Sequence, residues 1–146
     1  MVTAVQSRPT RAILDLPPYD SWWKGQVLDL YSVYYNRPIV EGYFHWSGDR
    51  PESRILVDNM KEFRCYFEPG QATANYSAEL GDQKRDAILT SLLKYDIRVV
   101  VVHKTLMGSP SECGAAPLFI DALLEEKERW EVLLDSPTKR VLWLRR

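Results

Sequence analysis

The segment from residue 82 to residue 103 constrains the fold more than any other part of this 146-residue chain. Residues 82–95 form a helical pattern whose apolar face consists of Ile88, Leu89, Leu92 and Leu93. Residues 97–103 follow directly and are rich in β-branched side chains, which favours a central strand. A helix that passes directly into a buried strand is typical of a domain in which helices cover a sheet.

Shorter patterns on both sides complete the expected order of elements. Residues 12–16 are predicted as a buried strand that Pro17 and Pro18 stop. Further helices are expected at residues 27–35, 51–67 and 117–128, and an extended segment at residues 37–43. Two closing strands, 130–134 and 140–144, have a connection of suitable length for a hairpin.

Together these elements predict an α/β fold, a two- or three-layer sandwich around a mixed sheet. The sheet is expected to contain parallel pairs and a C-terminal antiparallel hairpin. Residues 1–10 are polar and are predicted to be a flexible N-terminal segment, and residues 11–146 a single α/β domain.

Charge and hydropathy exclude several classes of protein. The net charge is −1 and the Lys and Arg residues are scattered along the sequence, so we expect no nucleic-acid partner. No apolar run approaches the roughly 18 residues of a membrane-spanning helix. The polar N-terminus resembles neither a signal peptide nor an anchor. We therefore expect a soluble chain, which could still be a domain excised from a longer protein.

The two cysteines, Cys65 and Cys113, leave two alternatives open. They could be unpaired thiols, or they could form one disulfide, which would indicate an oxidising compartment. Two cysteines without a C-x-x-C pair do not make a disulfide framework or a metal site.

Standard catalytic signatures are absent, including the nucleophile elbow, the zinc-protease helix and the glycine-rich phosphate loops. His45 and His103 are the only histidines, and without a carboxylate cluster they do not make a zinc site. We therefore predict no catalytic residue, no metal and no cofactor. His103 ends the predicted central strand, where either a binding role or a purely structural one is open.

Asp15 and a cluster of aromatic rings are the remaining candidates. Asp15 lies in an apolar strand, where a carboxylate must be paired or hydrogen-bonded, with the next turn or with Arg37. The rings could stack on a sugar or peptide, or could form ordinary packing. They are Tyr19, Trp22, Trp23, Tyr31, Tyr34, Tyr35, Tyr43, Phe44 and Trp46.

Three segments and the closing hairpin, taken in order, resemble a known family. They are residues 13–17, 34–43 and 92–104. The chain is similar to the C-terminal extracytoplasmic domain of polytopic prokaryotic membrane glycosyltransferases of the mannosyltransferase-like group. In that family a V-L-D-L-P strand follows the last membrane helix, and a G-I-R-Y-V-V-V-H helix–strand unit comes later. The chain departs from the family pattern at two places. The T-x-H-G that precedes the proline in the family is missing, so that Asn36 directly follows Tyr35, and Glu41 replaces the first glycine of a pair.

The resemblance implies a domain beside a catalytic site that lies elsewhere in a membrane enzyme. It implies a location on the extracytoplasmic face and a partner in the membrane-embedded part of the same polypeptide. It also implies a glycan or a lipid-linked sugar as ligand. The candidate binding residues are Asp15, Tyr34, Tyr35, Arg37, Glu41 and His103.

Two other functions stay open at this point. The chain could be a stand-alone carbohydrate- or peptide-binding domain that uses its aromatic cluster. It could also be a small enzyme built on Asp15, His103 and Lys104, which requires these three side chains to converge in one pocket.

Overall fold

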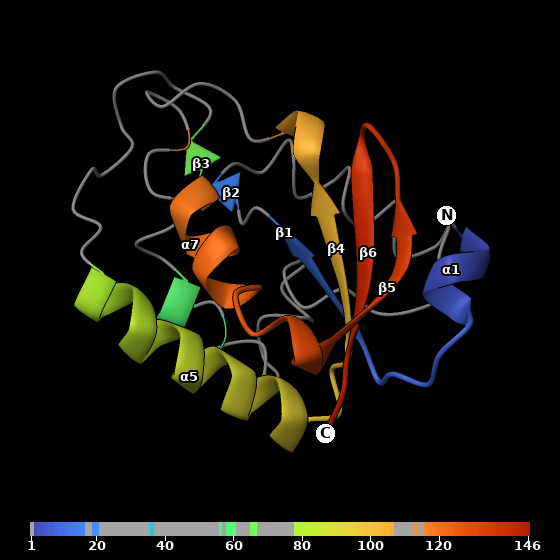
Figure 1. Ribbon diagram of the computed structural model, residues 1–146, viewed down its shortest axis with the longest axis horizontal. Coiled ribbons are helices and arrows are strands. Elements are labelled where there is room, and N and C mark those ends of the chain that lie inside the picture. Colours follow the sequence, from blue (N-terminus) through green and yellow to red (C-terminus); the bar gives the residue numbers. More distant parts are fainter. Residues whose placement is uncertain are drawn as a thin grey trace.

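A computed structural model describes residues 2–16, 19–20, 36, 56, 58–60, 65–66, 78–106, 113 and 116–146 (Figure 1). The helices among these residues are α1 (Val2–Gln6), α5 (Ala78–Lys94) and α7 (Ala116–Leu123), with the short 3₁₀ turns η2 (Lys104–Leu106) and η3 (Lys127–Arg129). The strands are β1 (Ile13–Leu16), β2 (Tyr19–Asp20), β3 (Cys65–Tyr66), β4 (Val99–His103), β5 (Trp130–Asp135) and β6 (Lys139–Leu144).

The main sheet has four strands in the order β1-β4-β6-β5. β1 pairs with β4 in parallel, whereas β4 pairs with β6 and β6 with β5 in antiparallel fashion. The predicted mixed sheet and C-terminal hairpin are thereby confirmed. β2 and β3 form a separate parallel pair, with Tyr19 opposite Cys65.

A larger core lies between one face of this sheet and the helices α5 and α7. Because side chains alternate along a strand, Leu14, Val100 and Leu142 all point to this face. Phe119 and Leu92 reach them from the two helices and are fully buried. The expected inward faces of both helices are confirmed by this packing.

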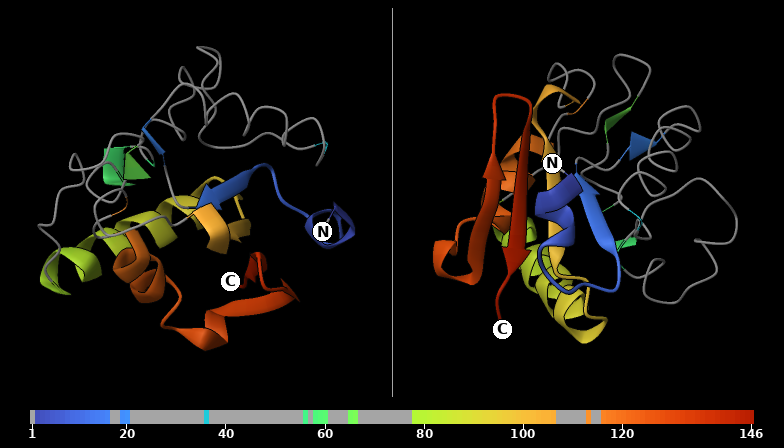
Figure 2. Two further views of the ribbon diagram at one scale, coloured as in Figure 1. Left: turned by 90° about the horizontal axis from the view of Figure 1, so that it is seen from above. Right: turned by 90° about the vertical axis from the view of Figure 1, so that its right-hand side faces the viewer.

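A smaller core lies on the opposite face, where α1 covers the sheet. Val5 of α1 is fully buried against Ile13, Val99 and Val101 of β1 and β4. In the right-hand view of Figure 2, α1 lies in front of the strands and α5 behind them. The sequence patterns gave no indication of α1, which lies within residues 1–10.

A short turn over residues 95–98 ends α5 and leads the chain into β4. Asp96 has φ 56°, in the left-handed region that Asp tolerates better than most residues. The amide of Ile97 donates to the carbonyl of Leu92 at 2.9 Å and that of Asp96 to Leu93 at 3.3 Å. These two bonds form the Schellman arrangement that ends a helix, and Ile97 and Leu92 share the same core.

Several predicted boundaries differ from the structure. Leu56 and residues 58–60 are helical, but Cys65 and Tyr66 belong to β3, so the helix expected over 51–67 is wrong at its C-terminal end. Local helical spacing gave way there to strand pairing with β2. α5 begins earlier than expected, and α7 ends at Leu123, before the expected end at residue 128; the separate turn η3 begins at Lys127. The elements predicted at 27–35 and 37–43 lie outside the described residues, apart from Asn36.

Cys113 is buried and disulfide-bonded, so the alternative of two unpaired thiols is wrong. The sequence contains one other cysteine, Cys65. Within the part of the chain that the structure describes, no helix is both long enough and apolar enough to cross a bilayer.

The packing of α7 predicts different costs for two neighbouring truncations. Phe119→Ala should lower the free energy of unfolding by about 3–5 kcal/mol, because it removes a fully buried ring from the larger core. Leu118 is 55% exposed, so Leu118→Ala should change that free energy by no more than about 0.5 kcal/mol. Urea denaturation measures both, and equal losses would contradict this orientation of α7.

Candidate functional site

Asp15 and His103 meet at the carboxyl ends of the two parallel strands. Asp15 of β1 is opposite Val101 of β4, and His103 lies two residues further along β4. Alternation places all three side chains on the same face of the sheet, the face that α1 partly covers. Nε2 of His103 contacts Oδ1 of Asp15, an ion pair when the imidazole is protonated.

Both side chains of this pair are withdrawn from solvent. Asp15 is 1% exposed and His103 is 2% exposed. Neither oxygen of Asp15 accepts a hydrogen bond of full geometry from any described residue, so the carboxylate depends on its electrostatic contacts. Burial raises the pKa of Asp15 above its ordinary 3.8, although the contact with His103 and the charges of His103 and Lys139 oppose the rise.

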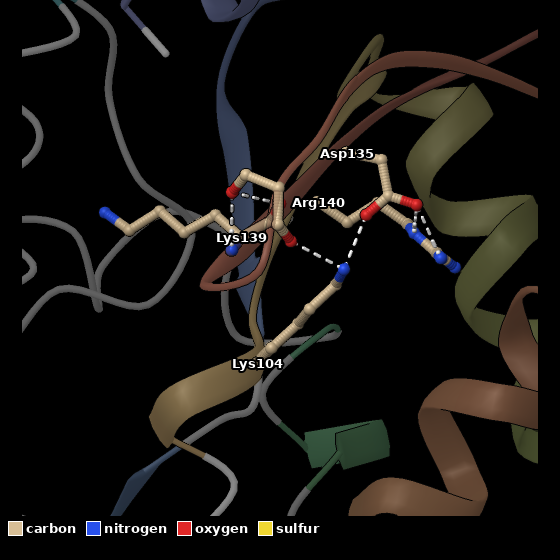
Figure 3. A network of polar contacts seen from close by, with 5 residues as sticks. Lys104, Asp135, Lys139 and Arg140 are labelled. Carbon is tan, nitrogen blue, oxygen red and sulfur yellow. Dashed lines mark hydrogen bonds and ion pairs between the residues drawn. The ribbon is translucent and has the colours of Figure 1, made fainter.

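Lys139 is the third member of this charge cluster. It lies on β6 directly opposite His103 of β4 in the antiparallel register. Burial lowers the pKa of Lys139, and the negative charge of Asp15 opposes that shift. In Figure 3 the side chain of Lys139 points away from the polar network of the hairpin. The charge cluster therefore consists of Asp15, His103 and Lys139, from three adjacent strands.

Lys104 does not belong to the cluster, so the convergence that an enzyme built on Asp15, His103 and Lys104 would require is not found. β4 ends at His103, and Lys104 is the first residue of the 3₁₀ turn η2, so it no longer follows the alternation of the strand. Its Nζ donates to Oδ1 of Asp135 at 2.5 Å and to the carbonyl of Ser136 at 2.7 Å (Figure 3). Lys104 thus fastens the hairpin turn to the end of β4.

Asp135 is the centre of this second, exposed network. Oδ2 of Asp135 accepts hydrogen bonds from Nη2 and Nε of Arg140 at 2.7 and 3.1 Å. The hydrogen bonds from Arg140 and then Lys104 lower the pKa of Asp135 from 3.8 to about 2. This end of the hairpin therefore carries two cations around one carboxylate that stays ionised at any ordinary pH.

The charge cluster pairs a histidine with a carboxylate, as a catalytic dyad does, but neither side chain is accessible to a substrate from solvent. A histidine oriented by a carboxylate can activate a nucleophile only if its other nitrogen reaches one. Both members here are buried, and the described residues offer no group of three His, Cys, Asp or Glu side chains that could hold a metal. The arrangement instead joins β1, β4 and β6 by charge.

A polar groove lies on the helical side of the molecule. It has a volume of about 360 Å³ and is lined by Arg85, Asp86, Leu89, Thr90, Leu93, Glu126 and Arg129. Nη1 of Arg85 lies 3.2 Å from Oε2 of Glu125 and 3.3 Å from Oδ1 of Asp82. Since α5 covers the sheet face opposite to the charge cluster, groove and cluster are separate.

The other sequence-predicted binding residues lie outside the described part of the chain. These are Tyr34, Tyr35, Arg37 and Glu41, so their roles and the pairing of Asp15 with Arg37 stay predictions. Asn36, which lies among them, is exposed and has φ 52°. Asn tolerates this left-handed conformation, which is typical of a tight turn.

The sequence points to Asp15 and to His103 separately, but it predicts neither their contact nor the part of Lys139. The alternation of Lys139, Val141 and Trp143 along the last strand was available as a signal. This alternation predicts the place of Lys139 only once the strand register, which pairs Lys139 with His103, is known. That register is a property of the assembled sheet.

The fold and the cluster define a mixed α/β domain with a buried charge cluster at the carboxyl end of its parallel strands. No protein-family model matches the chain, and no curated protein is similar to it in sequence. Among solved structures, it is similar to the C-terminal globular domain of an oligosaccharyltransferase from Archaeoglobus fulgidus. That match has 13% sequence identity and a TM-score of 0.48, and it covers 97% of this chain and 92% of that chain.

The contact between Asp15 and His103 predicts strong coupling in a double-mutant cycle. His103→Leu should cost about 3–5 kcal/mol of unfolding free energy, because it leaves a buried carboxylate without its partner. Asp15→Leu should cost about 1–3 kcal/mol. The double variant should be more stable than His103→Leu alone, as urea denaturation can measure. His103→Leu combined with the distant Leu118→Ala is the control and should be additive.

A further variant, Asp15→Asn, tests the direction of the pKa shift of Asp15. With a raised pKa in the folded state, Asp15 holds its proton when the unfolded chain has already released it, above pH 3.8. Stability should therefore fall as the pH rises from 3.8 to the native pKa. Asp15→Asn should lack this fall, and an unchanged pH profile in that variant would contradict the shift.

The exposed network predicts a second titration. Arg140→Met should raise the pKa of Asp135 from about 2 towards 3.8, and Lys104→Met should raise it by less. Because the folded pKa is depressed, the stability from Asp135 is present above pH 3.8 and is lost as the pH falls through about 2. Carboxyl NMR titration measures the shift, and Arg8→Met should leave it unchanged. A constant pKa in Arg140→Met would show that the network is not formed.

Proposed function

We propose that this chain is a non-catalytic, extracytoplasmic domain of a membrane glycosyltransferase, where it aids acceptor binding or assembly. The observation that carries the proposal is the convergence of Asp15 and His103. These two residues come from two separate segments on which the family resemblance rests, residues 13–17 and 92–104. The contact between Asp15 and His103 gives both short motifs the same physical role.

That role is structural. A group that transfers a proton to a substrate must come within hydrogen-bonding reach of it, directly or through one water. Asp15 and His103 are both almost completely buried, and Asp15 faces His103 and Lys139. A motif whose charged residues hold strands together fits a domain that supports chemistry taking place elsewhere.

The disulfide at Cys113 supports the extracytoplasmic part of the proposal. Stable disulfides form in oxidising surroundings such as the exterior of the cell or the bacterial periplasm, and they are rare in most cytosolic proteins. The proposed partners are the membrane-embedded part of the same polypeptide and a glycan or lipid-linked sugar. The proposed contacts of the ligand are Tyr34, Tyr35, Arg37 and Glu41.

The proposal predicts how activity divides between this domain and its parent. Membranes from cells that express the complete gene should transfer a radiolabelled sugar from a lipid-phosphate donor, and this chain alone should transfer none. In the complete protein, Asp15→Asn with His103→Gln should lower the amount of folded protein, while activity per folded molecule stays unchanged. Loss of a structural residue lowers the amount of folded protein, whereas loss of a catalytic residue lowers the activity per folded molecule.

Arg140→Gln in the exposed network is the matched control and should change neither quantity. A complete gene with no membrane-spanning segment outside this chain would overturn the proposal. So would a loss of activity per folded molecule in the Asp15 and His103 variant, because that result would favour an enzyme built on these residues.

A further inference from the structure

Several arginine residues lie at the end of the sheet opposite to the hairpin turn. The amide of Arg11 donates to Asp96 and that of Leu144 to Arg98, each at 2.8 Å, while the amide of Arg145 donates to Arg129 at 2.8 Å. These bonds hold the starts of β1, β4 and β5 beside the last residues of the chain. Figure 1 shows the C-terminus, the end of α5 and the start of β5 together at this end.

This basic end is defined by residues 8–11, 94–98, 126–131 and 145–146. These segments contain eight Lys or Arg residues and four Asp or Glu residues, whereas the whole chain has a net charge of −1. The remaining residues are therefore acidic overall. Arg11, Arg145 and Arg146 are exposed, so the excess positive charge faces solvent.

Arg98 shows that the basic end is more than a set of flexible surface charges. It is 8% exposed, and its Nε donates to the carbonyl of Leu144 at 2.8 Å. Its guanidinium lies 4.0 Å from the ring centre of Trp143, with Arg8 at 5.7 Å from the same ring. Arg8 is paired with Glu131, but no carboxylate pairs with Arg98 in the described part of the chain. Among the described residues, Arg98 is thus a positioned cation with no carboxylate beside it.

Aromatic rings accompany these cations. Trp143 is partly exposed and its Nε1 donates to the carbonyl of Pro9 at 3.4 Å. Tyr95 is also partly exposed, and Nζ of Lys94 lies 5.3 Å from its ring centre. Trp and Tyr are the residues that gather at the headgroup level of bilayers, where a ring meets both apolar and polar surroundings. Lys and Arg beside them attract anionic lipids.

We propose that the basic end docks on an anionic phospholipid surface. The exposed Arg11, Arg145 and Arg146 would contact the headgroup phosphates, and Tyr95 and Trp143, which Arg98 holds in place, would lie at the level of the headgroups. The opposite end of the sheet offers no such surface among the described residues, since Lys104 and Arg140 surround Asp135 there. The inference goes beyond the proposed glycosyltransferase function and does not depend on it.

The test uses this chain and sedimentation with sucrose-loaded vesicles. Binding is expected to vesicles of phosphatidylglycerol mixed with phosphatidylcholine, to weaken as salt rises, and to be much weaker with phosphatidylcholine alone. Each Lys or Arg near an anionic surface changes affinity about five-fold. Arg11→Gln with Arg145→Gln and Arg146→Gln should therefore weaken binding about a hundred-fold. All three side chains are exposed, so the variant should fold.

The matched control removes cations from the opposite end. Lys104→Gln with Arg140→Gln should leave vesicle binding within about two-fold of the unaltered chain, since those side chains would face away from the bilayer. Equal losses in both variants would mean that overall charge is responsible, and this would overturn the proposal. It would also be overturned by equal binding to the two kinds of vesicle or by no binding to either. None of these results bears on sugar transfer by the complete gene product.

Discussion

Parallel pairing of β1 with β4 is the contact on which the rest of this domain depends. It joins the first strand of the chain to the central strand, with Ile13 opposite Val99 and Leu16 opposite Val102. Both strands are buried along their whole length, so each must be apolar on both faces. Asp15 is the exception in β1, and the structure places His103 and Lys139 around it. The carboxylate of Asp15, which β1 buries, is therefore compensated by His103 of β4 and Lys139 of β6.

The two ends of the sheet differ in how they handle charge. At the hairpin end, the carboxylate of Asp135 pairs with both Lys104 and Arg140 and cancels one of their two positive charges. At the other end, Arg98 is stacked on Trp143 and bonded to a backbone carbonyl, and the exposed Arg11 and Arg145 lie on neighbouring segments. A domain with this asymmetry has a preferred orientation towards any charged surface, even though its net charge is close to zero.

Local patterns predicted the elements whose character depends on their own residues. The apolar face of α5 and the β-branched run of β4 identified helix and strand, and the hairpin followed from two strands and a short connection. Local patterns failed for elements whose structure depends on contacts with distant parts of the chain. The stripe from Leu56 to Phe67 has helical spacing, yet Cys65 and Tyr66 pair with β2. The helix α1 has no strong pattern, because it depends on Val5 packing against the sheet.

Sequence alone determined that the chain is an α/β domain with a terminal hairpin and that Asp15 needs a partner. Those conclusions rest on periodicity and on the cost of burying a carboxylate, which are properties of short segments. Only the tertiary structure decided that the partner is His103, that Lys139 and not Lys104 completes the cluster, and that the arginines share one end. Register and strand order bring those residues together, and both result from the packing of the whole sheet.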